Sequence, residues 1–146
     1  MKNPKWLTQI APVPGPFNGY WPQRGWNKEA FVLTFSRLDY PQEPDRVPAG
    51  KAYPLLRGVA YAGSRGISKV ELSFDGGRTW NETRLRKILP ADNWMPFTYV
   101  WTPPAPGVYG VVVRATDGEG TVQDPAERDS FPDGATGYHT VKITVV

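Results

Sequence analysis

Proline and glycine interrupt this chain every few residues, and no other feature restricts its fold as much. The 146 residues include sixteen prolines and fifteen glycines. Proline removes a backbone hydrogen bond from a helix interior, and glycine weakens a helix by its conformational freedom. Long helices therefore have little room, whereas short strands joined by turns fit well. Because 40% of the residues are hydrophobic and 13% aromatic, the chain can still bury a core. We predict one domain of the all-β class.

Charge and residue content argue against several kinds of partner. The net charge of +3 comes from Lys and Arg residues spread along the chain, so a nucleic-acid surface is not indicated. No apolar run approaches the ~20 residues that cross a bilayer, and the first fifteen residues lack the apolar region of a signal peptide. We therefore predict no membrane contact by this chain. The absence of Cys excludes thiolate ligands, and a single His makes an all-protein transition-metal site improbable.

Apolar and polar residues alternate with the period of a half-buried strand in several stretches. They span residues 31–38, 53–62, 69–75, 97–101, 107–115 and 141–145. In the first stretch Phe31, Leu33 and Phe35 are predicted to face the core. The proline-rich and charged residues from Tyr40 to Gly50 are predicted to form a loop, and residues 63–66 a turn.

The clearest local signal is a hairpin. Val70, Leu72 and Phe74 alternate with polar residues, which predicts a strand with one solvated face. Asp75-Gly76-Gly77 then supplies residues that tolerate a positive φ, as tight hairpin turns require, and Thr79 to Leu85 is predicted to return as the partner strand.

About seven short strands without a convincing helix predict two antiparallel sheets packed face to face, as in an immunoglobulin-like (E-set) β-sandwich. Residues 1–30, which we call the arm, show no sustained periodicity and are predicted to be irregular. Residues 31–146 are predicted to form the sandwich. We expect Trp80, Trp101 and Tyr109 to lie in the core, and Trp6, Tyr20, Trp21, Trp26 and Trp94 to lie in loops or the arm.

Three segments, in order, resemble one protein family. The residues YPLLRGVAYAGSRGISKVELSFDGGRTW (53–80), VVVRATDGEGTVQ (111–123) and GYHTVKITVV (137–146) are similar to the dimerisation domain of molybdenum-cofactor (molybdopterin) oxidoreductases of the sulfite oxidase and assimilatory nitrate reductase family. The resemblance covers about residues 30–146. It implies a carboxy-terminal module that pairs catalytic subunits in a homodimer and has no activity alone.

The arm resembles the last stretch of the molybdenum domain, which precedes the dimerisation domain in this family. A Tyr of that stretch reaches toward the metal in some members, and the comparable position here is Trp26, which has no phenol hydroxyl. The resemblance implies that Trp21, Arg24, Trp26 and Arg128 contact the catalytic molybdenum domain of the same polypeptide. It also implies that molybdopterin and molybdenum belong to the parent enzyme, while this chain binds no cofactor and supplies no catalytic residue.

One departure from the family bears on substrate. Members complete an anion pocket for sulfite with an Arg in the loop before the final strand, where this chain has Pro132 or Asp133. Either the substrate differs, or Arg128 takes that role through another loop path. The family also suggests an exported or periplasmic location, although the sequence itself does not fix one.

Other polar residues favour structural roles. Asp75 is predicted to form the hairpin turn, His139 to be hydrogen-bonded, and the residues 117–120 to form a turn and not a calcium loop. An accessory carbohydrate-binding sandwich, with exposed Trp residues in a row, is the alternative function. A hydrolase with paired carboxylates among Asp75, Asp117, Glu119 and Asp133 is the least favoured hypothesis. If a catalytic domain is missing, an exposed apolar patch is expected around the arm.

Overall fold

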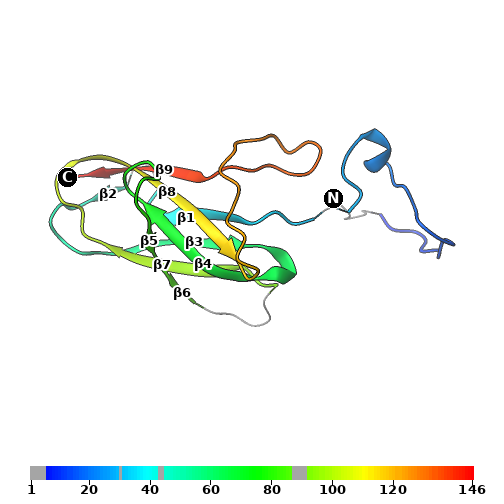
Figure 1. The fold of residues 1–146 in the computed structure, drawn as a ribbon, viewed down its shortest axis with the longest axis horizontal. Helices are drawn as coiled ribbons and strands as arrows, with labels where there is room; N and C mark the ends of the chain where they lie inside the picture. Colours follow the sequence, from blue (N-terminus) through cyan, green and yellow to red (C-terminus); the bar gives the residue numbers. More distant parts are fainter. Residues whose placement is uncertain (1–5, 30, 43–44, 87–91) are drawn as a thin grey trace.

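The computed structural model describes residues 6–29, 31–42, 45–86 and 92–146, which form two β-sheets packed face to face with the arm at one end (Figure 1). One sheet has the order β1-β3-β7-β6, and the other has the order β2-β9-β8-β4-β5. The bounds are β1 Phe35–Tyr40, β2 Arg46–Val47, β3 Tyr53–Tyr61, β4 Ile67–Ser73, β5 Asn81–Glu82, β6 Arg84–Leu85, β7 Met95–Trp101, β8 Gly107–Asp117 and β9 His139–Val145. Two 3-10 turns complete the regular structure, η1 Pro22–Arg24 and η2 Gly63–Arg65. The predicted β-sandwich is confirmed.

The core lies between the two sheets and is built from alternate strand residues. Val70 and Leu72 of β4, and Val111, Val113 and Ala115 of β8, are buried as predicted. Leu56, Phe97, Trp101, Ile143 and Val145 complete the centre of this layer from the neighbouring strands. Burial of these apolar side chains is the main stabilising contribution, at about 1.5–3 kcal/mol for a large one.

Gly58 lets β3 pack closely between β1 and the Phe97 ring of β7. A Cβ atom at this position would lie 2.0 Å from the carbonyl oxygen of Arg37 on β1 and 2.6 Å from Cζ of Phe97. Only a residue without a side chain allows the Phe97 ring to fill the space between the sheets, since protein cores are close-packed.

The first strand begins four residues later than predicted and buries the opposite face. β1 begins at Phe35, and its buried residues are Ser36 and Leu38, so Phe31, Leu33 and Phe35 do not form its inner face. Phe31 is 70% exposed. The Ser36 hydroxyl can lie inside because it donates a hydrogen bond of 2.7 Å to Oε1 of Gln123. A hydrogen-bonded polar residue therefore lies inside, although the alternation placed it on the outer face.

The predicted hairpin is confirmed at its turn and corrected in its return strand. Gly76 and Gly77 have φ of 75° and 89°, as a DGG turn requires, and β5 pairs antiparallel with β4. The chain then passes to the other sheet, where β6 pairs with β7, so residues 79–85 are not one strand. Thr83 marks the crossing, because its amide and hydroxyl both donate to the carbonyl of Val70 at 2.9 Å.

Three further expectations are corrected. The predicted loop from Tyr40 to Gly50 contains β2, which pairs in parallel with β9. The solvated face of β4 is largely covered, because Glu71 is 8% exposed and Ser73 is fully buried. Trp80 lies outside the core cluster, with its ring over the guanidinium of Arg114.

Within the described residues, no helix has the length and hydropathy to cross a membrane.

Candidate functional site at the arm end of the sandwich

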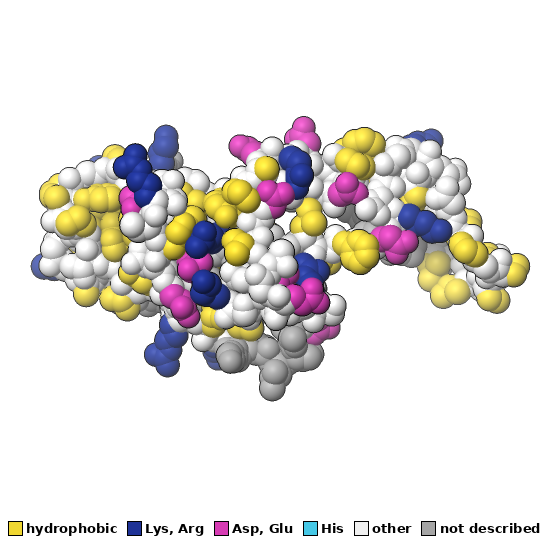
Figure 2. Space-filling view, in the orientation of Figure 1, with side chains coloured by type: hydrophobic (Ala, Val, Ile, Leu, Met, Phe, Trp, Pro, Cys, Tyr) yellow, Lys and Arg dark blue, Asp and Glu magenta, His cyan; other side chains and the backbone are white. Residues whose placement is uncertain are grey.

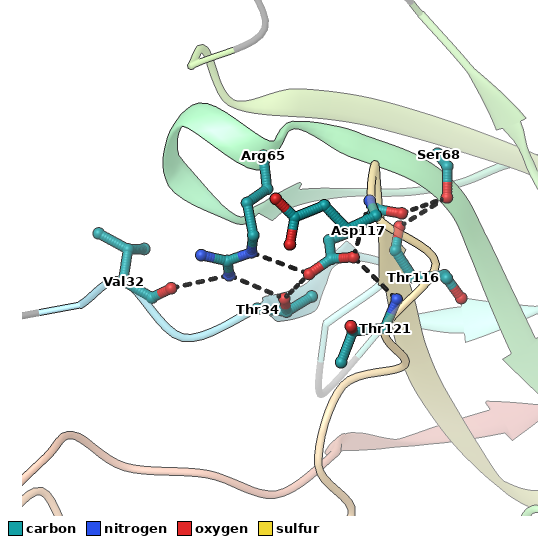
Figure 3. Close-up of polar contacts among 8 residues, drawn as sticks. Val32, Thr34, Arg65, Ser68, Thr116, Asp117 and Thr121 are labelled. Carbon is teal, nitrogen blue, oxygen red and sulfur yellow. Dashed lines mark hydrogen bonds and ion pairs between the residues drawn. The ribbon is translucent and has the colours of Figure 1, made fainter.

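An ion pair between Arg65 and Asp117 links η2 to the end of β8, at the end of the sandwich where the arm lies (Figure 3). Arg65 lies in η2, between β3 and β4, and its Nε donates to Oδ2 of Asp117 at 2.9 Å. Asp117 is the last residue of β8, where the pairing with Ile67 of β4 ends. The Asp117 side chain is only 2% exposed, whereas that of Arg65 is 25% exposed. The ion pair therefore closes this end of the sandwich.

Asp117 also builds the turn that follows β8. Its Oδ1 accepts hydrogen bonds from the amides of Glu119 at 3.1 Å and Thr121 at 2.8 Å. Burial alone would raise the pKa of Asp117, but the hydrogen bonds from Arg65 and these amides, with the Arg65 charge, outweigh it and lower the pKa. The predicted structural turn at residues 117–120 is confirmed, and the carboxylate that might have been a ligand is fully engaged within it.

The same guanidinium holds the chain that leaves the arm. Nη2 of Arg65 donates to the carbonyl of Val32 at 2.9 Å and to the hydroxyl of Thr34 at 3.2 Å. Gly118 lets the turn approach η2, since a Cβ atom there would lie 2.1 Å from the carbonyl oxygen of Arg65. The Arg65 side chain thus helps to position the segment that connects the arm to β1. Sequence analysis did not single out Arg65, because an Arg in a turn gives no periodic signal.

The arm folds against the loop before β9. Trp21, Arg24 and Trp26 come together around η1, with Trp21 and Trp26 edge to face at 6.2 Å and Arg24 over the ring of Tyr20 at 3.4 Å. Trp26 packs edge to face on Phe131 of the loop, at 5.4 Å between centroids. Three of the four predicted contact residues are therefore adjacent.

Asn27 joins the arm to Pro132 and Asp133 in the loop before β9. The backbone N–H of Asn27 donates to the carbonyl of Pro132 at 3.1 Å, and its side-chain Nδ2 donates to Oδ1 of Asp133 at 2.7 Å. Asp133 therefore serves to attach the loop to the arm. A carboxylate here would repel a dianion that an Arg would attract.

Arg128 lies on the same loop, and its ion pair and hydrogen bond stay within that loop. It forms an ion pair with Asp124, and its Nε donates to the hydroxyl of Thr136 at 3.1 Å. Glu127 and Asp129 flank it in the sequence and line the same shallow hollow. Three carboxylates, those of Asp124, Glu127 and Asp129, thus accompany the Arg128 guanidinium, so this part of the loop does not offer an anion a strongly positive surface.

The expected apolar patch around the arm is confirmed (Figure 2). Trp6 is 93% exposed, and large hydrophobic side chains are exposed at intervals through the described part of the arm and at Phe31 just after it. They include Leu7, Ile10, Val13, Phe17, Tyr20, Trp21 and Phe31. Soluble monomers rarely present so many large apolar side chains along one segment, which is typical of a surface that meets another protein part. The rings from Tyr20 to Trp26 meet at 90° and 78°, so they do not form the flat row that sugar rings stack on.

The remaining candidates have structural roles. Asp75 accepts hydrogen bonds from the amide and hydroxyl of Thr79 and from the hydroxyl of Ser73, which hold its pKa below the ordinary value. Asp75 follows β4 whereas Asp117 pairs with the first residue of β4, so the two carboxylates are at opposite ends and their pairing as a hydrolase site was wrong. Nδ1 of His139 accepts a hydrogen bond from the amide of Leu38 at 3.1 Å, as expected of a structural histidine.

The fit of a metal or cofactor can be judged from the residue types present. The chain contains no Cys, and the described residues bring together no group of three or more His, Cys, Asp and Glu side chains that could hold a metal. These residues do not fit a molybdenum centre ligated by thiolate. The fold and its exposed end thus define a class: a disulfide-free, immunoglobulin-like β-sandwich module with a surface suited to a neighbouring domain.

Comparison with known proteins identifies the family. The model of the Mo-co oxidoreductase dimerisation domain matches residues 34–145, which span the whole sandwich. The chain belongs to this family. It is 28% identical over 139 residues to sulfite oxidase of Gallus gallus, covering 82% of this chain and 30% of that enzyme. The chain therefore spans about a third of the length of this relative.

Solved structures agree on the fold. The sulfane dehydrogenase SoxCD from Paracoccus pantotrophus is 22% identical with a TM-score of 0.59, over 75% of this chain and 29% of that one. The CARDB domain of the PF1109 protein from Pyrococcus furiosus, solved with di-metal ions, is also 22% identical, with a TM-score of 0.50 over 80% of this chain and 96% of that domain. At these identities the likeness concerns the β-sandwich alone.

Proposed function

We propose that this chain pairs two copies of a longer molybdenum-cofactor oxidoreductase and is not catalytic alone. The observation that carries the proposal is the family match over residues 34–145, together with a sandwich whose polar clusters are engaged in structural contacts. Closed two-fold pairing is the commonest form of self-association among soluble proteins.

The arm is proposed to be the end of the parent's molybdenum domain, at residues 1–30. Its exposed apolar side chains support this, because they would be covered in the longer protein. Trp21, Arg24 and Trp26 are proposed to contact that domain around η1. Arg128 is proposed to contact it from the loop that the arm meets through Asn27.

The parent is proposed to hold molybdopterin and molybdenum outside this chain and to oxidise sulfite or a related compound. The resemblance to sulfite oxidase supports the reaction class. The carboxylates around Arg128 argue that a sulfite-like dianion would be bound by residues of the molybdenum domain and not by this loop.

The test is the solution mass of the full chain by light scattering, from about 1 to 100 µM, with an assay for sulfite-dependent electron transfer. We expect the mass to rise toward twice 16.3 kDa with concentration and the assay to be blank. Turnover by the isolated chain, or a monomer at every concentration, would contradict the proposal.

A further inference from the structure

The outer face of β8 and β9 carries an exposed valine and a mid-strand glycine that the fold of the chain does not require. It consists of the outward residues of β8 and β9, paired as Val108 with Thr144, Gly110 with Lys142, and Val112 with Thr140. We call these six residues the β8–β9 face. Their neighbours Val111, Val113 and Ile143 point into the core, so this face is the outside of the sandwich. Val108 is 67% exposed, although it lies within a regular strand.

Gly110 is the informative residue of this face. A glycine in the middle of a strand weakens it, because it adds backbone freedom and no side-chain packing. Gly110 does not have a positive φ, and a Cβ atom built on it would meet no atom within 4 Å. The contrast is Gly58, where a Cβ atom would collide with the carbonyl of Arg37. Nothing inside the chain requires glycine at position 110, and a mid-strand glycine of this kind often marks the close approach of another backbone or ligand.

We propose that the β8–β9 face is the surface on which a second copy of this chain packs, with Gly110 at the point of closest approach. This inference rests on the proposed function, which supplies the partner. An isologous interface uses the same patch twice, so the open space above Gly110 in one copy is matched by the same space in the other. The exposed Val108 beside it provides apolar area.

The charges at the end of this face are already paired within the chain. Beyond Val112 on the same side of β8, Nε of Arg114 lies 2.9 Å from Oε2 of Glu71, whose Oε1 lies 3.1 Å from Nζ of Lys69. Trp80 covers the guanidinium at 4.0 Å. A partner that covers this cluster leaves no carboxylate unpaired, which avoids the main cost of burying charge. Arg and Trp are also the residue types that dominate interface energies.

The opposite outer face is less suited to pairing with itself. The outward residues of β1, β3 and β6 include Arg37, Arg57 and Arg84, with Asp39 as the carboxylate that pairs with Arg37 at 2.7 Å. Two copies meeting through this face would bring like charges together, which costs free energy. The β8–β9 face itself carries one cation, Lys142, and the adjacent Arg114 is paired with Glu71, so fewer like charges would meet across it than across the opposite face.

Two exposed valines provide a matched test in the full chain. Val108→Arg places a cation on the β8–β9 face, and Val100→Arg places the same cation at a 61% exposed position of β7 on the opposite face. Sedimentation equilibrium measures the dimer dissociation constant. We expect Val108→Arg to raise it at least tenfold and Val100→Arg to change it less than threefold. Both variants should keep the wild-type circular dichroism, because both positions are exposed.

A second measurement tests the same face by cross-linking and does not require that a variant weaken the dimer. The chain has no Cys, so Val108→Cys and Val100→Cys each introduce a single thiol for a short bismaleimide. Cross-linked dimer should form from Val108→Cys and not from Val100→Cys. Gly110→Ala should weaken dimerisation while raising the urea midpoint of the dilute monomer, since alanine suits a strand better than glycine.

The outcomes separate the two proposals. If the wild type dimerises but Val100→Arg dissociates it, or neither valine variant does, the β8–β9 face is refuted and the pairing function stands. If the wild type is monomeric throughout, the pairing function fails, and this inference fails with it.

Discussion

The Arg65–Asp117 ion pair gives a quantitative prediction for the Asp117→Asn variant. The substitution keeps an oxygen for the amides of Glu119 and Thr121, removes the negative charge, and turns an NH₂ group toward the guanidinium. Removing one partner of a buried pair costs about 3–5 kcal/mol. Because the Arg65 side chain is 25% exposed and gains hydration, we expect a loss of about 2–3 kcal/mol. For a chain of this length, that lowers Tm by about 8 °C.

The pH dependence of this loss follows from the lowered pKa of Asp117. A carboxyl whose pKa is lower in the folded than in the unfolded state stabilises the fold above the unfolded pKa, near 3.9, and loses that contribution as the pH falls through the folded pKa. The Tm difference between wild type and Asp117→Asn should therefore be full at pH 7 and shrink below about pH 4.

Calorimetry on wild type, Asp117→Asn, Arg65→Met and the double variant measures the coupling directly. We expect the double variant to be more stable than the sum of the single losses predicts, by about 1 kcal/mol or more. A Tm change within 2 °C for Asp117→Asn, or strict additivity, would refute the assignment of this pair as the closure of the sandwich end.

Three further predictions concern the core, the arm and the histidine. Gly58→Ala should unfold the chain or lower its Tm strongly, because the new Cβ has a backbone oxygen 2.0 Å away; a soluble variant with wild-type Tm would contradict the packing. Replacing Ile10 and Phe17 by Ser should reduce binding of an apolar fluorescent dye without changing Tm, since both side chains are exposed. Burial lowers the pKa of His139, so its resonance, which is the single histidine signal of the chain, should titrate in NMR spectra below the ordinary 6.5, and titration above that value would show that Asp39 dominates. Since the unfolded state then binds its proton first, urea stability should decrease as the pH falls below 6.5.

The fold was predictable from sequence because strand alternation and turn residues act locally. Val111, Val113 and Ala115 face the core as the period of two requires, and Gly76 and Gly77 form the turn with the positive φ that glycine permits. The failures have non-local causes. Ser36 replaces an apolar residue inside because Gln123, 87 residues away, accepts its hydrogen bond.

The alternation of apolar residues also does not show which of the two sheets a strand joins. Residues 79–85 contain no signal that the chain crosses between sheets at Thr83, because the crossing is stabilised by the carbonyl of Val70 on another strand. Trp80 was expected in the core and instead covers Arg114 on the outer face, where the cation and the ring attract each other.

The candidate site was predicted in part. Trp21, Arg24 and Trp26 are adjacent, and the exposed apolar arm followed from composition and resemblance. Arg65 was missed, since its role depends on groups brought together from the segment before β1, η2 and the end of β8. Such a convergence of distant segments has no signature in a single sequence.

Native mass spectrometry of an equilibrated mixture of unlabelled and ¹⁵N-labelled chains tests the pairing claim most directly. If two copies associate reversibly through one two-fold interface, the spectrum should contain a dimer of intermediate mass beside the two pure dimers, each near twice 16.3 kDa. A spectrum with only the two monomer masses at micromolar concentration would contradict the account.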